Sequence, residues 1–213
     1  MQTFKEYYIE EGKFSKAVAA GAIGLASLMP QSTNAAIPNN NSQISQNIQS
    51  SKSLSRDTDF VNHIKSVENS IMKGWDKRER KWYPHKSFEG GTDTIAYGHK
   101  LTRDDINSGK FDNGIAMSEA EDLLLQDIKK HEDRVRRIMK NQYDVNYDTL
   151  SIPQKFLLTD YEYTGVLKKF PSFTVALLVG NKAEMIKQHE RKSNGVPLKD
   201  RNARTADYIN QNF

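Results

Sequence analysis

Hydrophobic and polar positions follow two different periods along this chain, and a helical period comes first. In the stretch DTDFVNHIKSVENSIMKG, which begins at residue 57, apolar side chains recur at Phe60, Ile64, Val67 and Ile71. That spacing places them on one side of a helix. Gly74 follows them as a stop signal, so the pattern predicts a first helix across residues 57–74.

The pattern changes in WDKRERKWYPHKSFEGGTDTIAYGHKL, residues 75–101. Aromatic residues alternate here with turn-forming residues, including Pro84 and the pair Gly90-Gly91. Short runs bounded by glycine and proline are typical of strands. The stretch therefore predicts a small antiparallel sheet of two or three short strands.

Helical spacing then returns and continues to the end of the chain. Ser118 and Glu121 have the spacing of a capping box, ahead of a helix with one apolar side formed by Ala120, Leu124, Ile128, Val135 and Ile138. Further helices are predicted after Ser151 with Pro153 (closed by Gly165), after Ser172 (closed by Gly180), after Asn181 with Glu184 at the capping position, and across Lys199–Asn212. One helix, a small antiparallel sheet and a larger helical lobe on which they pack define an α+β fold class.

Residues 1–36 have a different character. The run Ala17–Met29 is small and apolar, but its thirteen residues fall short of the roughly 20 that a membrane span needs. It has the length of a signal-peptide core, with small residues for cleavage up to Ala35, and it allows transient membrane association through residues 17–29. The alternatives are a capsid tag clipped before Gly12 and a short amphipathic helix with no targeting role.

Residues 37–56, IPNNNSQISQNIQSSKSLSR, are rich in Asn, Gln and Ser. Such a composition cannot bury enough apolar surface to offset the entropy of ordering, so it predicts a flexible linker. The chain then divides into a targeting or propeptide segment (1–36), a linker (37–56) and one folded domain (57–213).

Composition narrows the chemistry further. The 213 residues include no cysteine, which excludes disulfides, thiolate zinc sites and cysteine nucleophiles. The net charge of +4 favours polyanionic partners such as an acidic bacterial wall. Basic residues are mixed with acidic ones along the chain, so no nucleic-acid partner is predicted. His85 and His99 lack metal-ligand spacing, and we expect neither a metal nor another cofactor.

Glu68 is the first candidate catalytic residue. It interrupts the apolar side of the predicted first helix, close to Val61 and Ile64. A carboxyl group there is partly desolvated, which raises its pKa, and a glutamate with a raised pKa suits protonation of a glycosidic oxygen. The simpler alternative is a boundary glutamate that reaches solvent, as most charged residues do.

The stretch FEGGTDTIAYGHKL, residues 88–101, supplies a second group of candidates. A carboxylate on this turn, Glu89 or Asp93, would complete the two-carboxylate arrangement of glycoside hydrolysis. Thr94 offers a hydroxyl group that could hold water. Asp93 is its neighbour in the chain and should point to the opposite face of a regular strand.

Aromatic residues near these candidates could contact sugar rings. Trp75, Phe88 and Tyr97 are the candidates for substrate binding. Trp82 and Tyr83 are explained at least as well as core residues of the small sheet.

Glu68, the aromatic hairpin and TIAYGHKL together resemble the phage-type lysozymes, the muramidases of glycoside hydrolase family 24. The later segments LSIPQKFLLTDYEYTG and NGVPLKDRNARTADYI are similar to later helices of that family, so the resemblance spans about residues 60–210. It implies a lysozyme-like fold with Glu68 as the acid and a hairpin carboxylate as its partner. It also implies that Thr94 positions water and that His99 is a structural brace.

Three departures from the family pattern affect the second catalytic group. His85 stands where the family usually has aspartate, the hairpin before Thr94 is three residues longer, and Ala96 replaces a glycine. The partner of Glu68 is then Glu89 or His85, or the enzyme is impaired. We favour Glu89, because the longer hairpin could bring it to the cleft.

These observations predict a phage endolysin, a bacteriolytic and antimicrobial lysozyme. It would hydrolyse the β-1,4 bond between N-acetylmuramic acid and N-acetylglucosamine in host peptidoglycan. It would act as a monomer in the host periplasm and cell wall, or travel packaged in the virion. The alternatives are a non-catalytic virion or wall-binding protein that keeps the fold, and a lytic transglycosylase, which needs the acid but no water-activating partner.

Overall fold

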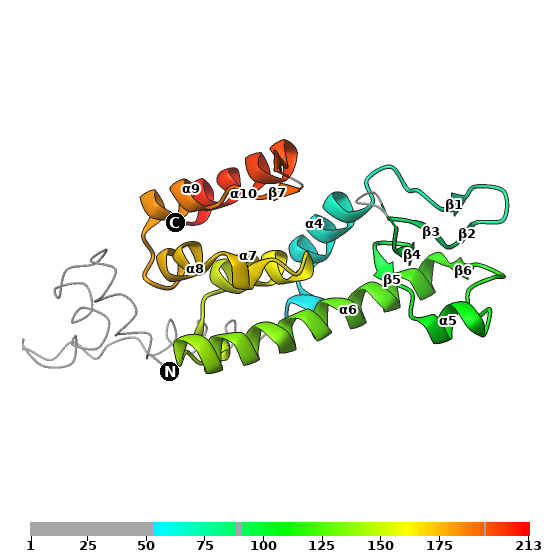
Figure 1. The fold of residues 1–213 in the computed structure, drawn as a ribbon, viewed down its shortest axis with the longest axis horizontal. Coiled ribbons are helices and arrows are strands. Elements are labelled where there is room, and N and C mark those ends of the chain that lie inside the picture. The colour runs from blue at the N-terminus through cyan, green and yellow to red at the C-terminus, as the bar shows by residue number, and fades with distance from the viewer. Residues whose placement is uncertain (1–52, 88–90, 194) are drawn as a thin grey trace, which may run out of the picture.

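The computed structural model describes residues 53–87, 91–193 and 195–213. The segment 1–36, most of the predicted linker, Phe88 and Glu89 lie outside the described residues. The described chain combines helices with small antiparallel sheets, which confirms the α+β class (Figure 1).

The helices dominate the described chain. They are α4 (Thr58–Glu68), α5 (Arg103–Asn107), α6 (Met117–Ile138), α7 (Ile152–Tyr163), α8 (Pro171–Leu178), α9 (Lys182–Gln188) and α10 (Lys199–Asn212). Single helical turns are η1 (Leu54–Arg56), η2 (Met139–Tyr143), η3 (Tyr147–Thr149) and η4 (Leu167–Lys169).

The strands are short and all pair antiparallel. One sheet joins β1 (Trp75–Asp76), β2 (Lys81–Trp82) and β6 (Ile115–Ala116), and a second joins β3 (His85–Lys86), β4 (Asp93–Ile95) and β5 (His99–Lys100). A separate hairpin pairs β7 (Lys192–Ser193) with β8 (Val196–Pro197). The sequence predicted one sheet and missed both β6 and this hairpin.

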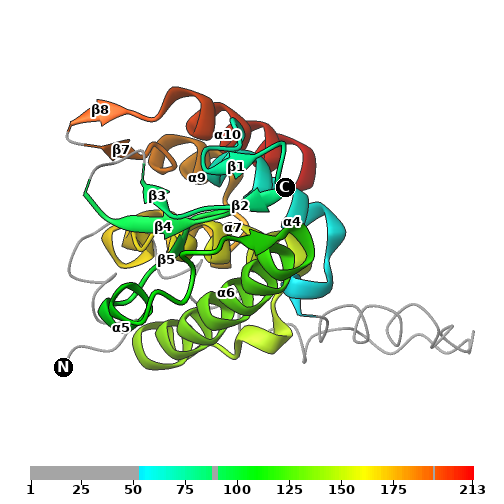
Figure 2. The ribbon, with the colours of Figure 1, turned by 90° about the vertical axis from the view of Figure 1, so that its right-hand side faces the viewer.

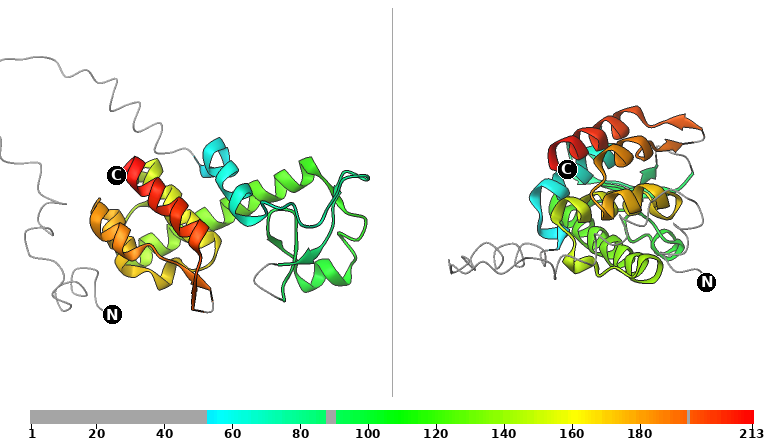
Figure 3. Two further views of the ribbon diagram at one scale, coloured as in Figure 1. Left: turned by 90° about the horizontal axis from the view of Figure 1, so that it is seen from above. Right: turned by 90° about the vertical axis from the view of Figure 1, so that its left-hand side faces the viewer.

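Two hydrophobic cores lie toward opposite ends of α6, with α4 between the lobes (Figures 1 and 3). The larger core is formed by the helices, and α6 contributes Leu124 and Ile128 to it. The smaller core lies under the sheets and includes Trp82, Ile95 and, from the first turns of α6, Ala120. The predicted apolar side of this helix is therefore confirmed, and it contributes side chains to the cores of both lobes.

The first helix is shorter than predicted. It ends at Glu68, because Asn69 adopts a non-helical conformation and directs its side chain to distant backbone. The Asn69 amide donates to the carbonyls of Lys73 at 3.0 Å and Ala96 at 2.7 Å, and its oxygen accepts from the Lys73 amide at 2.8 Å. These bonds replace the hydrogen bonds of a continuing helix. Glu68 therefore lies at the end of a helix and not within it.

Two predicted helix starts are wrong by a few residues. Helix α6 begins at Met117, where Glu119 accepts from the Ala116 amide at 2.8 Å, while Glu121 pairs with Lys65. Helix α8 begins at Pro171, ahead of Ser172. The starts predicted at Ser151, Asn181 and Lys199 agree with α7, α9 and α10.

The folded chain also begins earlier than the predicted boundary at residue 57. Turn η1 packs on α4 and α6, and the Leu54 side chain is fully buried. The Leu54 amide donates to Glu132 at 3.1 Å, and the Ser53 hydroxyl donates to the same carboxylate. Residues 53–56 of the predicted linker therefore belong to the fold. The buried Leu54 side chain and the hydrogen bonds to the buried Glu132 carboxylate hold them in place.

Candidate active site

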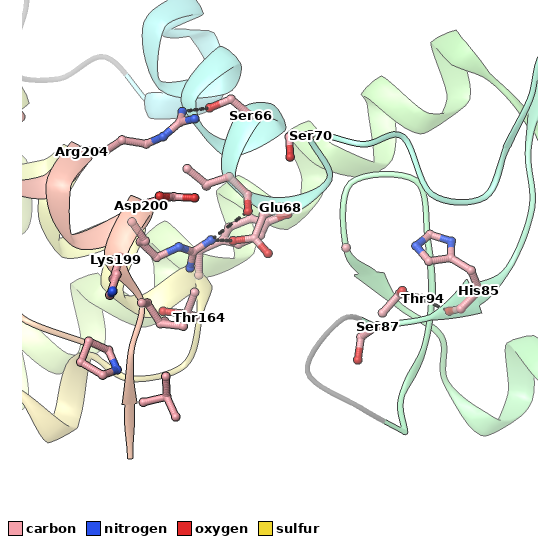
Figure 4. Close-up of a pocket in the computed structure, with 17 residues that line it drawn as sticks. Ser66, Glu68, Ser70, His85, Ser87, Thr94, Thr164, Lys199, Asp200 and Arg204 are labelled. Carbon is pink, nitrogen blue, oxygen red and sulfur yellow. Dashed lines mark hydrogen bonds and ion pairs between the residues drawn. The ribbon is translucent and has the colours of Figure 1, made fainter. Parts of the chain in front are cut away.

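Figure 2 shows α10 and hairpin β7–β8 above the sheet of β3, β4 and β5. A groove of about 820 Å³ lies between the helical lobe and this sheet (Figure 4). One wall consists of the end of α4, the start of α10 and hairpin β7–β8, and it includes Glu68, Arg201 and Val196. The opposite wall includes His85 and Thr94. The structure thus brings together Glu68, His85 and Thr94, which the sequence selected independently of any contact between them.

Glu68 is held by an arginine from the last helix. The Arg201 guanidinium donates to Glu68 Oε1 at 2.5 Å and to the Val67 carbonyl at 3.3 Å, and the Glu68 side chain is 20% exposed. The sequence predicted a carboxyl group among apolar side chains. The actual partner is a cation, which stabilises the charged carboxylate. Arg201 therefore fixes the position of the Glu68 carboxyl group before any ligand binds.

The second carboxylate oxygen of Glu68 lies near the hairpin wall. A Cβ atom built on Gly98, whose φ is +85°, would stand 3.5 Å from Glu68 Oε2. The residue after Glu68, Asn69, is bonded to Ala96, two positions before Gly98. The end of α4 is thus anchored directly beside the strand that carries Thr94.

The hairpin wall is set by strand pairing. His85 pairs with Thr94 in the antiparallel register of β3 and β4, and the Thr94 hydroxyl donates to the His85 carbonyl at 3.2 Å. Asp93 does not line the groove and pairs with Lys86 at 2.8 Å. The predicted opposite orientation of Asp93 and Thr94 is therefore confirmed.

His99 lies outside the groove and connects the lobes. Its Nδ1 contacts Asp127 Oδ2 of α6 at 2.7 Å, and its ring packs against Phe111. This contact ties β5 to the long helix. It is the geometry of a brace, and nothing in the position of His99 brings it to the groove.

Two of the aromatic residues predicted to bind substrate lie elsewhere. The Trp75 ring packs against Trp82, 5.3 Å between centroids, in the small core. Tyr97 packs between the two cores, and its hydroxyl contacts Met117. Neither lines the groove, because Trp75 packs on the smaller core and Tyr97 packs where the two cores meet. Phe88 and Glu89 cannot be placed, as they lie outside the described residues.

Residues that the sequence did not select complete the groove. Arg201, Asp200 and Arg204 come from the first turns of α10, and Tyr163 comes from the end of α7. Burial raises the pKa of Tyr163 well above its usual value, with the negative charges of Asp127 and Glu68 acting in the same direction. Tyr163 is therefore a neutral phenol. The segment NGVPLKDRNARTADYI is rich in basic residues, and this was the sequence signal that could have drawn attention to Arg201. It does not indicate that Arg201 pairs with Glu68.

The arrangement has the parts of an acid–base site. Glu68 offers a carboxyl group on one wall, and His85 and Thr94 offer an imidazole and a hydroxyl group on the other (Figure 4). A carboxyl group that faces an imidazole and a hydroxyl group across a groove can exchange protons with a ligand bound between them.

Among the helices that the structure describes, none combines the length and apolar character that a membrane span requires. Comparison with models of known families, with characterised proteins and with solved structures finds no match to this chain.

Proposed function

We propose that this chain is a peptidoglycan muramidase with a lysozyme-like fold. It hydrolyses the β-1,4 bond between N-acetylmuramic acid and N-acetylglucosamine, as expected for a phage endolysin. The observation that carries the proposal is the position of Glu68, which Arg201 holds at 2.5 Å in a groove whose other wall bears Thr94 and His85. The resemblance to the phage-type lysozymes also selects Glu68 and Thr94.

The groove suits a polysaccharide strand. Its volume of about 820 Å³ lies in the range of ligand sites, and it is open enough for a polymer to extend beyond it. Lys199, Arg201 and Arg204 outnumber the acids Glu68 and Asp200 on the α10 wall, which leaves a small excess of positive charge there. This charge attracts an anionic cell wall, and salt weakens the attraction.

Glu68 acts as the acid in this proposal. Arg201 orients the carboxyl group, and a sugar strand that fills the groove removes water from around it. Desolvation opposes the effect of the Arg201 charge and favours the protonated form of a carboxyl group, which is the form that can protonate the leaving oxygen. Part of the binding energy of the polymer is thus used to favour the protonated form of Glu68 before the proton is transferred to the leaving oxygen.

A lytic transglycosylase is the second candidate. On the described part of the hairpin wall the groove is lined by His85, Ser87 and Thr94, and no carboxylate is among them. A transglycosylase needs only the acid, because the substrate's own hydroxyl group attacks the reacting carbon. Its product ends in a 1,6-anhydro sugar, whereas hydrolysis leaves a reducing end.

The test compares the full-length wild type with Glu68→Gln on purified cell walls, with the released fragments identified by mass. We expect wild type to release fragments with reducing muramic acid, and Glu68→Gln to lose about 10²–10⁴-fold in rate. Asp200→Asn is the matched control, because it removes another carboxylate from the groove.

Equal losses in Glu68→Gln and Asp200→Asn would contradict a specific acid role for Glu68. Anhydro ends from wild type would replace hydrolysis by transglycosylation. No release by a folded wild-type protein would overturn the enzyme proposal and favour the non-catalytic virion or wall-binding protein.

A further inference from the structure

His85 is built into the hairpin wall more firmly than a surface histidine. Its Nδ1 lies 3.2 Å from the Tyr83 carbonyl oxygen. A carbonyl oxygen can only accept, so this contact places the ring proton on Nδ1. The other ring nitrogen, Nε2, then carries a lone pair and can accept a proton.

Gly74 provides the space for this ring. A Cβ atom at Gly74 would lie 2.4 Å from His85 Nδ1 and 2.6 Å from the Tyr83 carbonyl oxygen. Gly74 also has a φ of +86°, and its carbonyl accepts from the Tyr83 amide at 2.8 Å. Only glycine fits here, and its absent side chain allows the contact that orients His85.

The surroundings leave His85 Nε2 available to a ligand. Within the described part of the chain, Nε2 makes no hydrogen bond, while His85 lines the groove opposite Glu68 (Figure 4). Asp93 is the described carboxylate nearest in sequence on this wall, and it is paired with Lys86 outside the groove. The described hairpin wall therefore offers an imidazole where a carboxylate would be expected.

We infer that His85 is the general base of this site and takes the place of the second carboxylate. The inference rests on the proposed glycosidase function and assigns its second catalytic residue. It replaces our preference for Glu89, which was based on the length of the hairpin and on the glycines that follow Glu89.

The step balances as a single displacement. Glu68 gives its proton to the glycosidic oxygen, and the bond from that oxygen to the anomeric carbon breaks. Water attacks the same carbon from the hairpin side, and its proton passes to His85 Nε2. The Thr94 hydroxyl donates to the His85 carbonyl, so its oxygen can accept the second proton of that water in a hydrogen bond. The β-bond yields an α product, because water attacks the face opposite the leaving group.

The experiment measures wall hydrolysis by full-length His85→Ala, His85→Asp and Glu89→Gln, with the product anomer determined by NMR. We expect His85→Ala to lower kcat by about 10²–10⁴-fold with little change in KM. His85→Asp should recover most of this loss, because a carboxylate can also accept the proton. Glu89→Gln should stay within a few-fold of wild type. Lys86→Ala is the matched control, since Lys86 is exposed, next in sequence and outside the groove.

The outcomes separate this inference from the proposed function. An active wild type with an equally active and folded His85→Ala would overturn the base role and leave the glycosidase standing. A large loss in Glu89→Gln with His85→Ala active would assign the role to Glu89. Anhydro products or retention of the β configuration would also overturn the inference. An inactive, folded wild type would overturn the proposed function itself.

Discussion

Replacing Leu54 by alanine tests whether residues 53–56 belong to the folded domain. The Leu54 side chain is fully buried in the larger core, from a turn that composition alone assigns to a linker. Leucine-to-alanine changes at buried sites cost about 2–5 kcal/mol. For a domain of this size, that loss lowers Tm by about 4–20 °C.

The assay is thermal and urea unfolding of the full-length protein followed by circular dichroism. Ile71→Ala is the control, because it also shortens an aliphatic side chain but at a site that is 69% exposed, where changes stay within about 0.5 kcal/mol. Glu132→Gln is the second variant. It should also destabilise, since the Glu132 carboxylate accepts from the Leu54 amide and from the Tyr147 hydroxyl, each at 3.1 Å.

Equal stability of Leu54→Ala and Ile71→Ala would refute this reasoning. It would mean that η1 is not docked on α6 and that the fold begins near residue 57. If only Glu132→Gln lost stability, the stabilising effect of Glu132 would come from its contact with Tyr147 and not from its contacts with turn η1.

Three further predictions follow from single contacts. Arg201→Ala should lower kcat on cell walls by at least tenfold, because it frees Glu68, whereas Arg204→Ala, which loses a 2.9 Å contact with Ser66, should have a smaller effect in the same assay. Burial and then the positive charge of Arg134 lower the pKa of His131 to about 4, so the folded chain binds fewer protons than the unfolded chain between about pH 6.5 and 4. Stability therefore falls as pH drops through that window, and His131→Phe, which keeps a ring against Tyr163, should flatten the decline measured by urea unfolding. Ala96 has a φ of +54°, so Ala96→Gly should change the free energy of unfolding by less than about 1 kcal/mol, as relief of the left-handed strain offsets the lost methyl group. Ala96→Val should cost well over that in the same experiment, because a β-branched side chain does not tolerate this conformation.

Helix starts were predictable where a cap acts over three residues. Ser151 accepts from the Gln154 amide, and Asn181 accepts from the Glu184 amide at 3.1 Å, so each start can be read from a short stretch. The pair Ser118 and Glu121 has the same spacing but failed. Glu119 takes the capping position instead and accepts from the Ala116 amide. Glu121 pairs with Lys65 of another helix, a contact that local sequence does not reveal.

In the candidate site too, the sequence identified some residues but not the contacts that join distant segments. Residue types, helix periodicity and the family resemblance together selected Glu68, His85 and Thr94. Strand alternation correctly predicted that Asp93 points away from them. Arg201 was missed, since its contact with Glu68 joins positions 133 residues apart. Trp75 and Tyr97 were chosen as aromatic residues near the site, but an aromatic ring is equally suited to a core. Trp75 packs on the smaller core, and Tyr97 packs against both cores.

The links around Glu68 also determine how the groove can change its width. Asn69 bonds the end of α4 to Ala96, so Glu68 is tied to the strand that carries Thr94. On the other side the end of α4 is tied to α10 through side chains, Arg201 to Glu68 and Arg204 to Ser66 at 2.9 Å. A buried amide bonded to backbone is harder to separate than a partly exposed ion pair. Widening of the groove should therefore carry α10 and hairpin β7–β8 away from Glu68, while the distance between the acid and the hairpin wall is preserved. The chemistry would then keep its geometry while a polymer enters from the α10 side.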